Sequence, residues 1–382
     1  MKKYLDNLIE FLKVENMSGE EKDLVSTIVD KLIQTGLDKK HITIDDANEK
    51  IGFGNSGNLI ITIPGNIRGY RLLFSAHLDS VKTCKNAIPI IKKDYIESQG
   101  NTGLGGDNKA GCAIIFNLLQ EIIKNNLPHP PLTFVWMVQE ELGVNGSRHI
   151  NSDCLKDPKM GFNFDGSCDL VTGATGGDEI TIKVYGKSSH AGINPEKGIN
   201  ALVTTSTAIA NLKQEGWLGL VKKNGVRGSS NLIIANSSKG INVIPDQVTL
   251  KGEIRSYSSE LRTTIYKKFE QAFLNAIKNE KNTENEIGSL LINSINKYES
   301  FILDDSLEVV RLSQKIAHQL SIDDSLVSVN HCVDANWLNE KGIPTITIRN
   351  GNEFPHTTKE RINIKKFLNS CEFAHRIIAT FL

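Results

Sequence analysis

The chain has 382 residues, 39% of them hydrophobic, and a prior of about 150 residues per domain predicts two domains. Basic and acidic residues number 44 each, so the formal net charge is zero, which excludes both a global basic field for nucleic acid and an acidic, solvating chain. The ordinary apolar content and the 10 prolines argue against long disorder.

The first residues predict a helix of the mature fold rather than a targeting segment. Apolar residues recur at helical spacing from Tyr4 to Leu12, and Asp6 and Glu10 interrupt any apolar signal core. The sequence contains no run of the ~18 apolar residues that a membrane helix needs, so we expect no membrane partner and a cytoplasmic location. The six cysteines include no C-x-x-C pair, which favours scattered, reduced and mostly buried thiols.

Helical and strand patterns alternate in the first half of the chain. We expect helices at about 3–14, 20–36 and 108–125, and strands at 58–63, 70–76, 132–138 and 161–164. Short apolar runs separated by amphipathic helices are typical of buried strands in an α/β sheet.

The pattern changes at about residue 179. The expected order is then strand 179–186, helix 198–213, strands 231–236 and 247–255, helix 259–281 and strand 288–299, a ferredoxin-like β-α-β-β-α-β series. An α/β pattern returns after residue 300, with helices at 305–319, 334–341 and 359–380 and a strand at 345–348. We therefore predict an α/β domain formed by 1–176 and 301–382, with a mixed sheet flanked by helices, and an inserted αβ domain at 177–300.

Residues of metal-ligand type follow the apolar runs of the first domain. They are His77 and Asp79 after RLLFSA, Asp107 in the turn NTGLGGDNKAG, Glu140 and Glu141 after FVWMVQ, Asp165 after GFNF, and His356 after TITIRNGNEFP. The carboxyl ends of strands in an open parallel sheet collect ligand sites at one edge. We therefore expect these side chains to lie together.

Each of these residues also has an ordinary structural explanation. A single carboxylate after a strand is commonly solvated or caps a helix, and Asp107 could be such an N-cap. Glu140 and Glu141 could be surface charges, and a single His is commonly structural. However, the occurrence of all of these residues together at equivalent strand ends favours a metal site.

The spacing within the set suits metal chemistry. His77 and Asp79 are two positions apart and share a face of an extended chain, so the carboxylate can orient the imidazole. Glu140 and Glu141 are adjacent and point in different directions, so one can bind metal while the other acts as general base. Without the orienting Asp79 and the glutamate that acts as base, two His and three carboxylates remain as ligands. These are too many for one open tetrahedral zinc, but they match two zinc ions about 3.5–4 Å apart.

Strings spread over nearly the whole chain resemble the co-catalytic zinc metallopeptidases that include peptidase T, aminoacylase and succinyl-diaminopimelate desuccinylase. They are SAHLDS, GGDNKAG, QEELG, FDG, SSHAGINPEKGINA, GINVIPD, GEIRS and PHTTKE, in the order found in the family. The motifs GGDNKAG and VNGS are most similar to those of the peptidase T, or tripeptide aminopeptidase, branch. The resemblance implies a zinc-peptidase catalytic domain at 1–176 and 301–382, and a lid domain at 177–300 that also forms a homodimer.

The resemblance also implies a role for each metal-site residue. In these roles His77 and Asp165 bind one Zn²⁺, Glu141 and His356 bind a second, Asp107 bridges both, Asp79 orients His77, and Glu140 moves the proton of the bridging water. The bridging Asp of the family usually lies in a cis peptide with the next residue. That residue is Asn108 here, where many relatives carry a second Asp.

Three residues of the inserted domain match family positions that contact the substrate. The resemblance implies that His190 stabilises the oxyanion, often across a dimer interface, and that Asn242 and Arg255 hold a substrate carboxylate or backbone. The alternatives are a solvated loop His, a turn-forming Asn and an exposed strand Arg.

We therefore expect a dinuclear metallopeptidase that hydrolyses short peptides, with two Zn²⁺ per chain, for which Co²⁺ or Mn²⁺ could substitute. An N-acyl amino-acid deacylase or carboxypeptidase of the same family is the alternative enzyme, and the terminus that must be free distinguishes them. A non-catalytic zinc-binding dimeric scaffold is a third alternative, which the presence of Glu140 and every expected ligand disfavours.

Overall fold

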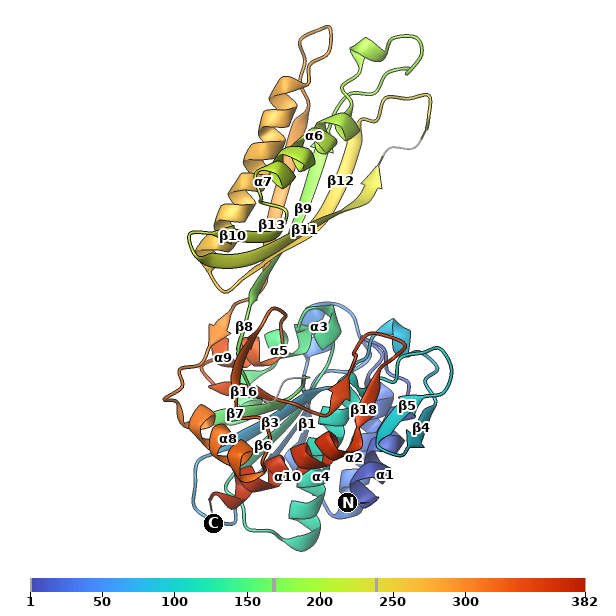
Figure 1. Ribbon diagram of the computed structural model, residues 1–382. Helices are drawn as coiled ribbons and strands as arrows, with labels where there is room; N and C mark the ends of the chain where they lie inside the picture. Colours follow the sequence, from blue (N-terminus) through green and yellow to red (C-terminus); the bar gives the residue numbers. More distant parts are fainter. Residues whose placement is uncertain (1, 167–169, 238–239, 382) are drawn as a thin grey trace. The chain divides into compact units, whose positions relative to one another are not determined.

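The computed structural model describes residues 2–166, 170–237 and 240–381, and the chain divides into two compact units. Unit 1 comprises Met1–Ala174 and Phe301–Leu382, and unit 2 comprises Thr175–Ser300 (Figure 1). Each unit has a hydrophobic core of its own. Unit 2 is therefore a continuous insertion between two segments that pack into one body.

Unit 1 is built on a mixed sheet that has nine strands among the described residues, in the order β1-β2-β6-β3-β7-β16-β8-β14, with β15 beside β8. The strands are β1 (Ile42–Ile44), β2 (Leu59–Ile63), β3 (Leu72–His77), β6 (Leu132–Met137), β7 (Met160–Phe164), β8 (Leu170–Ala174), β14 (Phe301–Ile302), β15 (Leu326–Val329) and β16 (Thr345–Ile348). The central strands β6, β3, β7 and β16 are parallel, whereas β2 and β8 pair with them antiparallel.

Helices cover both faces of this sheet, which explains why its central strands are continuous apolar runs. The helices of unit 1 are α1 (Lys2–Leu12), α2 (Lys22–Thr35), α3 (Ala47–Ile51), α4 (Gly106–Asn125), α5 (Asn145–His149), α8 (Glu308–Gln319), α9 (Ala335–Glu340) and α10 (Ile364–Ala379). Every residue of β3, β6 and β7 is buried. On one face Phe74 packs against Phe134 and Phe162, with ring centroids 5.3 and 5.6 Å apart, while Leu73 and Met137 pack on the other.

A second, four-stranded antiparallel sheet of unit 1 is absent from our sequence-based prediction. Its order is β17-β18-β5-β4, formed by β4 (Pro89–Lys92), β5 (Tyr95–Ser98), β17 (Asn352–Glu353) and β18 (Arg361–Asn363). These strands are too short to give a clear periodic pattern. The sheet matters because the loop between β17 and β18 carries His356.

Unit 2 is a five-stranded antiparallel sheet with the order β10-β11-β12-β9-β13. It contains β9 (Gly176–Tyr185), α6 (Ala201–Gln214), β10 (Gly219–Lys223), β11 (Val226–Ser237), β12 (Gln247–Ser256), α7 (Ser259–Asn279) and β13 (Ser289–Tyr298). Both helices cover one face, where the alternate residues Ile180, Ile182 and Val184 of β9 are buried with Phe269. The other face carries the intervening polar residues.

Strand β10 corrects the predicted β-α-β-β-α-β series. It forms a hairpin with β11 through Asn224 and Gly225, which both have positive φ, so β11 begins at Val226 rather than at 231. Asn-Gly is the preferred sequence of a two-residue hairpin turn, so the sequence does carry a local signal for this hairpin. Without β10 the strand order is that of the ferredoxin-like arrangement, and the predicted fold class of both units is confirmed.

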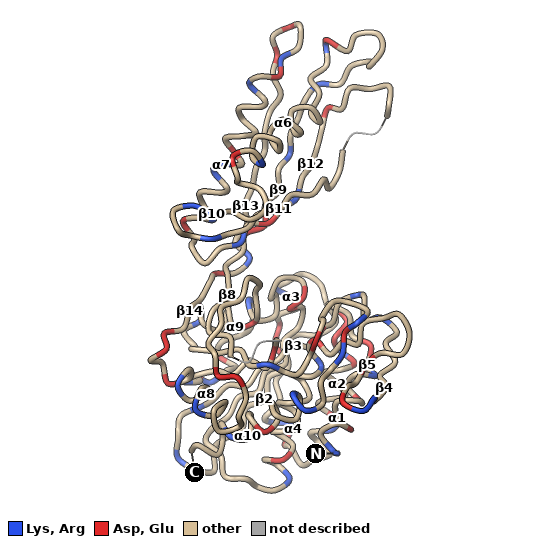
Figure 2. Tube along the Cα trace, in the orientation of Figure 1, with Lys and Arg blue, Asp and Glu red and all other residues tan. Residues whose placement is uncertain are grey.

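Surface properties agree with the composition. Lys, Arg, Asp and Glu are interspersed over both units (Figure 2). Of the helices in the described ranges, none is long and apolar enough to cross a membrane. The five described cysteines are free; Cys84, Cys112 and Cys371 are buried, and Cys168 lies outside the described residues.

Candidate metal centre

The carboxyl ends of the parallel strands position the candidate ligands of unit 1. His77 is the last residue of β3, Asp165 directly follows β7, and a short 3-10 helix, Glu140–Leu142, begins three residues after β6. Asp107 lies in the first turn of α4. His356 lies in the loop that follows β17.

These side chains meet around the carboxylate of Asp107. Its Oδ1 lies 3.3 Å from Nε2 of His77, and its Oδ2 lies 3.5 Å from Nε2 of His356. On the first side Asp165 Oδ1 is 3.8 Å from His77 Nε2, and on the second Glu141 Oε1 is 2.9 Å from His356 Nε2. The cluster therefore has two halves, each with one imidazole and one carboxylate, that share Asp107.

The charges of the cluster fit divalent cations. Hydrogen bonds to Asp107 and Glu141 raise the pKa of His356 to about 10. Burial opposes the charged form of His77, but the neighbouring carboxylates, Asp165 first among them, raise its pKa well above its usual value. Burial raises the pKa of Asp165 to about 8. The neighbouring carboxylates thus favour positive charge at both imidazoles, and a metal ion bound at the same nitrogen atoms would supply such a charge.

Asp79 has one contact that the sequence predicts and others that it does not. Its Oδ1 lies 3.3 Å from Nδ1 of His77, the position of a carboxylate that orients a ligating imidazole. The same carboxylate accepts the N–H of Glu140 at 2.9 Å and of Glu141 at 3.2 Å, and the hydroxyl of Ser18 at 2.6 Å. Asp79 therefore links the His77 end of the cluster to the turn that carries both glutamates.

Glu140 and Glu141 differ in how they are held. Glu141 pairs with His356 through its side chain, whereas Glu140 is anchored by its backbone, whose carbonyl accepts the N–H of Gly143 at 2.9 Å and of Val144 at 2.7 Å. Burial raises the pKa of Glu140 well above its usual value, against the influence of His77. A carboxylate with a raised pKa beside the cluster suits a group that takes up and returns a proton.

Asn108 ties the Asp107 turn to the strand that precedes Asp165. The Asp107–Asn108 peptide bond is cis, as the family resemblance implies. The amide of Asn108 donates to the carbonyl of Phe164 at 2.9 Å, while its Oδ1 accepts from Gly111 N at 2.9 Å and from Asn350 Nδ2 at 2.8 Å. An aspartate at this position would place a carboxylate oxygen against the Phe164 carbonyl.

We accordingly expect Asn108→Asp to lower the free energy of unfolding by at least ~1–3 kcal/mol at neutral pH, because it leaves a buried acceptor facing another acceptor. The loss should shrink as the pH falls, since burial raises the pKa of the introduced carboxyl and its protonation restores a donor. Urea unfolding at several pH values measures both effects, with Asn350→Ala as a variant that spares the Phe164 contact. Equal stability of Asn108→Asp and the parent chain at neutral pH would contradict this account.

In unit 2 the predicted residue His190 is exposed in the loop that follows β9. Its Nδ1 accepts the backbone N–H of Gly192 at 3.1 Å and of Ile193 at 3.2 Å. In the neutral ring the proton therefore resides on Nε2, which becomes a donor. Asn242 lies beside this loop, because its carbonyl accepts the N–H of Ala191 at 2.9 Å.

The structure separates Arg255 from those two residues. Arg255 pairs with Gly177 near the start of β9, whereas the His190 loop follows Tyr185 at its end. Eight residue steps of strand correspond to about 26 Å at ~3.3 Å per residue. The guanidinium of Arg255 is 2.9 Å from Glu253. The substrate-binding residues predicted in this unit therefore occupy opposite ends of one sheet.

The sequence analysis does not predict three buried carboxylates near the candidate metal centre. Glu21 accepts the N–H of Gly19 at 2.8 Å and of Gln139 at 3.1 Å, and burial raises its pKa to about 7. Burial also raises the pKa of Asp334 to about 6. Glu360 contacts the Asp107 turn. Of the three, only Glu360 belongs to a family-like string, PHTTKE, of which it is the last residue. The other two could not be predicted, because local sequence does not show that a charged side chain is buried.

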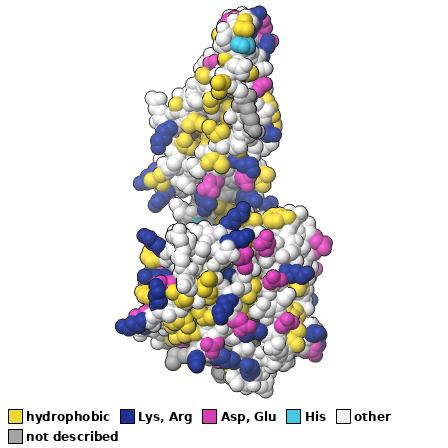
Figure 3. All heavy atoms as spheres, turned by 90° about the vertical axis from the view of Figure 1, so that its right-hand side faces the viewer, with side chains coloured by type: hydrophobic (Ala, Val, Ile, Leu, Met, Phe, Trp, Pro, Cys, Tyr) yellow, Lys and Arg dark blue, Asp and Glu magenta, His cyan; other side chains and the backbone are white. Residues whose placement is uncertain are grey.

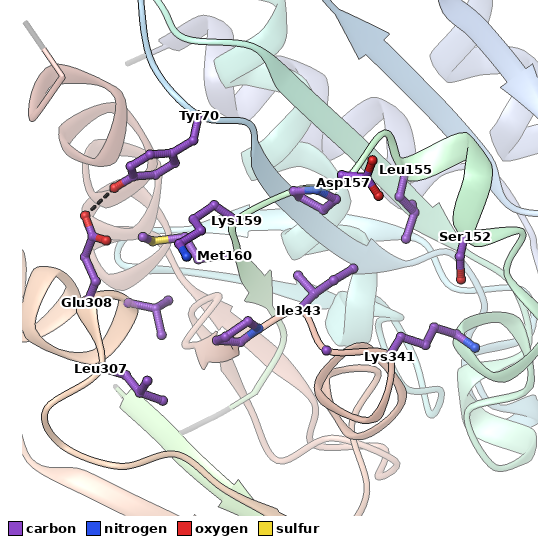
Figure 4. A pocket seen from close by; sticks show the side chains of 14 residues that line it. Tyr70, Ser152, Leu155, Asp157, Lys159, Met160, Leu307, Glu308, Lys341 and Ile343 are labelled. Atoms are coloured by element: carbon purple, nitrogen blue, oxygen red, sulfur yellow. Dashed lines mark hydrogen bonds between the residues drawn. The ribbon is translucent and has the colours of Figure 1, made fainter.

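A separate pocket of about 700 Å³ lies in unit 1 where β7 and β16 begin, lined by Met160 and Pro344 among others. Within it the Tyr70 hydroxyl donates to the carboxylate of Glu308 (Figure 4). The candidate ligands lie beyond the opposite, carboxyl ends of these strands. This pocket is therefore distinct from the metal centre.

Two family profiles match the chain. Residues 172–281 match a peptidase dimerisation domain, and residues 58–197 match peptidase family M28. A Bacillus subtilis protein, the uncharacterized protein YqjE, is 26% identical over 380 residues, which cover 99% of this chain and 98% of that protein.

Solved structures agree over the full length of the chain. A tripeptidase from Staphylococcus aureus is 29% identical with a TM-score of 0.86, and the aminopeptidase PepT from Bacillus cereus is 27% identical with a TM-score of 0.84. Both alignments cover 100% of this chain and 98% of the other. These matches agree with the resemblance that the sequence motifs indicate: the chain is similar to the peptidase T-like peptidases and has their fold.

Proposed function

We propose that this chain is a dinuclear zinc aminopeptidase that removes the N-terminal residue of short peptides, tripeptides in particular. The observation that carries the proposal is the position of Asp107, whose two carboxylate oxygens each face a different histidine. A carboxylate placed in this way suits two metal ions that share a ligand. The tripeptidase and PepT among the similar structures support the choice of substrate.

Under this proposal the five clustered residues hold the metal ions. His77 and Asp165 would bind one, Glu141 and His356 the other, and Asp107 both. When bound, the pair would polarise the scissile carbonyl and lower the pKa of a bound water toward ~7. Glu140 would take the proton of the attacking water and return it to the leaving amine, while Asp79 fixes the orientation of His77 and the position of the Glu140 backbone.

His190 would donate a hydrogen bond to the oxyanion of the tetrahedral intermediate. The support is its tautomer, because the two N–H groups that contact Nδ1 leave Nε2 as the donor. Asn242 lies beside it, and Arg255 would hold the substrate backbone or carboxylate.

The distance within unit 2 favours a second chain in each active site. About 26 Å of strand separates Arg255 from the His190 loop, whereas an extended tripeptide spans only ~10 Å. Two residues so far apart along one sheet are poorly placed to contact the same short peptide. A homodimer in which His190 comes from the partner subunit resolves this, and unit 2 matches a peptidase dimerisation domain. Apolar side chains are exposed on its surface (Figure 3). Leu202 and Val203 of α6 and Ile233 of β11 are among the exposed apolar residues of this unit.

We expect the full-length chain to sediment as a dimer at micromolar concentration, because a site that needs two chains requires a stable interface. Sedimentation velocity over a range of concentrations measures this, and activity per chain should fall where the dimer dissociates. A monomer with full specific activity would contradict the shared site.

The substrate class can be tested with free, N-acetylated and C-amidated forms of one tripeptide, with and without chelator. We expect cleavage of the free and C-amidated forms, little cleavage of the N-acetylated form, loss of activity after chelation, and recovery with Zn²⁺, Co²⁺ or Mn²⁺. Preference for the N-acetylated form would indicate a deacylase, and failure on the C-amidated form a carboxypeptidase. Metal binding without any hydrolysis would leave the scaffold alternative.

A further inference from the structure

We infer that Glu360 is a positioning residue that holds the Asp107 turn in the geometry that binds metal. Glu360 is 2% exposed and directly precedes β18, 253 positions from Asp107. The inference rests on the proposed function, since it assigns to Glu360 the support of a metal ligand. It adds a residue outside the five ligands and the base.

The two carboxylate oxygens of Glu360 are used separately. Oε1 accepts the N–H of Asp107 at 2.9 Å, and Oε2 accepts the N–H of Leu104 at 2.7 Å and of Gly105 at 2.8 Å. These N–H groups belong to the turn that begins α4, where the N-cap residue Gly105 provides no side chain of its own. Glu360 therefore binds three N–H groups of the turn that leads into the regular part of α4, because Asp107 and Asn108 have non-helical backbone angles.

The loop that carries Glu360 touches Asp107 twice. It runs from β17 to β18 and also contains His356, whose Nε2 lies 3.5 Å from Oδ2 of Asp107. Glu360 binds the backbone of Asp107, and His356 faces its side chain. Two contacts from one loop set where the Asp107 carboxylate stands relative to His356, so the loss of the backbone contact should loosen the shared part of the site.

The contact pattern requires a carboxylate rather than an amide. In Glu360→Gln the amide nitrogen would face either the Asp107 N–H or the N–H pair of Leu104 and Gly105, and two donors would oppose each other. The shape and volume of the side chain are otherwise preserved. Glu360 also interacts with the ammonium group of Lys109, which is 3% exposed, so a general loss of stability must be separated from a loss of metal binding.

Glu353→Gln is the matched control. Glu353 lies in β17 of the same small sheet, three residues before His356, and its carboxylate pairs with Arg361 at 2.8 Å and Lys366 at 2.6 Å. The exchange also replaces a partly buried, paired glutamate by glutamine near the same loop. Its carboxylate pairs with residues of β18 and α10 rather than with the Asp107 turn.

The experiment titrates the metal-free full-length chain and both variants with Co²⁺ and measures the dissociation constant, alongside thermal unfolding with and without the metal. We expect Glu360→Gln to weaken Co²⁺ binding ~10–100-fold and to reduce the stabilisation that the metal provides. Glu353→Gln should lower the unfolding temperature of the metal-free chain while retaining the parent affinity.

Each outcome separates the inference from the proposed function. Parent affinity in Glu360→Gln, or an equal loss of affinity in Glu353→Gln, would overturn the positioning role. If Glu360→Gln does not fold, Glu360→Asp, which keeps the charge on a shorter side chain, should show weakened Co²⁺ binding, and unchanged binding would overturn the role. A parent chain that binds no Co²⁺ would instead overturn the proposed metal centre.

Discussion

Replacing Glu140 by alanine is expected to abolish nearly all turnover while both metal ions remain bound. Under the proposed mechanism this carboxylate takes up and returns the proton of the water and contacts no metal. The alanine variant should therefore retain metal coordination and lose proton transfer. A well-placed general base contributes ~10²–10⁴ in rate. The structure supports the division of roles, because Glu141 pairs with His356 while Glu140 is held through its backbone.

Metal analysis beside steady-state kinetics decides the assignment. Glu140→Gln, which keeps the volume of the side chain, is the control for packing at this buried position, and it should be as inactive as the alanine variant. Glu141→Ala should lose metal as well as activity. Loss of one metal equivalent from Glu140→Ala would show that the roles of the two glutamates are exchanged.

His190→Ala is expected to lower the catalytic rate by ~10²–10³ with little change in KM or metal content. The reason is that a hydrogen bond to the oxyanion is strongest in the transition state and contributes little to binding of the ground state. His190→Gln retains an N–H donor on a longer side chain and should recover part of the loss. An unchanged catalytic rate in His190→Ala would reject the oxyanion role and leave a solvated loop His.

Hybrid dimers test whether His190 acts across the interface. Mixing His190→Ala with Glu140→Ala chains creates dimers in which one site combines an intact Glu140 with an intact His190 from the partner subunit. Part of the activity should therefore return after subunit exchange. No recovery, despite exchange demonstrated by labelled chains, would place His190 in the site of its own chain and would remove the main argument for a shared site.

The order of elements and the site at the strand ends could be predicted because both depend on local pattern. Buried parallel strands are continuous apolar runs, and the residue after each run must lie at the same edge of the sheet. This reasoning predicts that His77, Asp165 and Glu141 share an edge, and the structure places them at or shortly after the ends of β3, β7 and β6. The same reasoning does not predict short strands, because they give no clear periodic pattern. Strand β10 and the small sheet that contains β17 and β18 are examples.

The sequence by itself determined which residue types follow which strand, and with them the candidate ligands and the peptidase resemblance. Only the tertiary structure decided how these residues are supported. The buried carboxylates of Glu21 and Glu360 accept backbone N–H groups more than 100 positions away, and the local sequence around each does not show that it is buried. Likewise, Arg255 and His190 lie at opposite ends of one sheet, although each belongs to a string that resembles a family motif. The physical reason is that apolar periodicity is set by near neighbours, whereas burial of a charge depends on donors that distant segments bring to it.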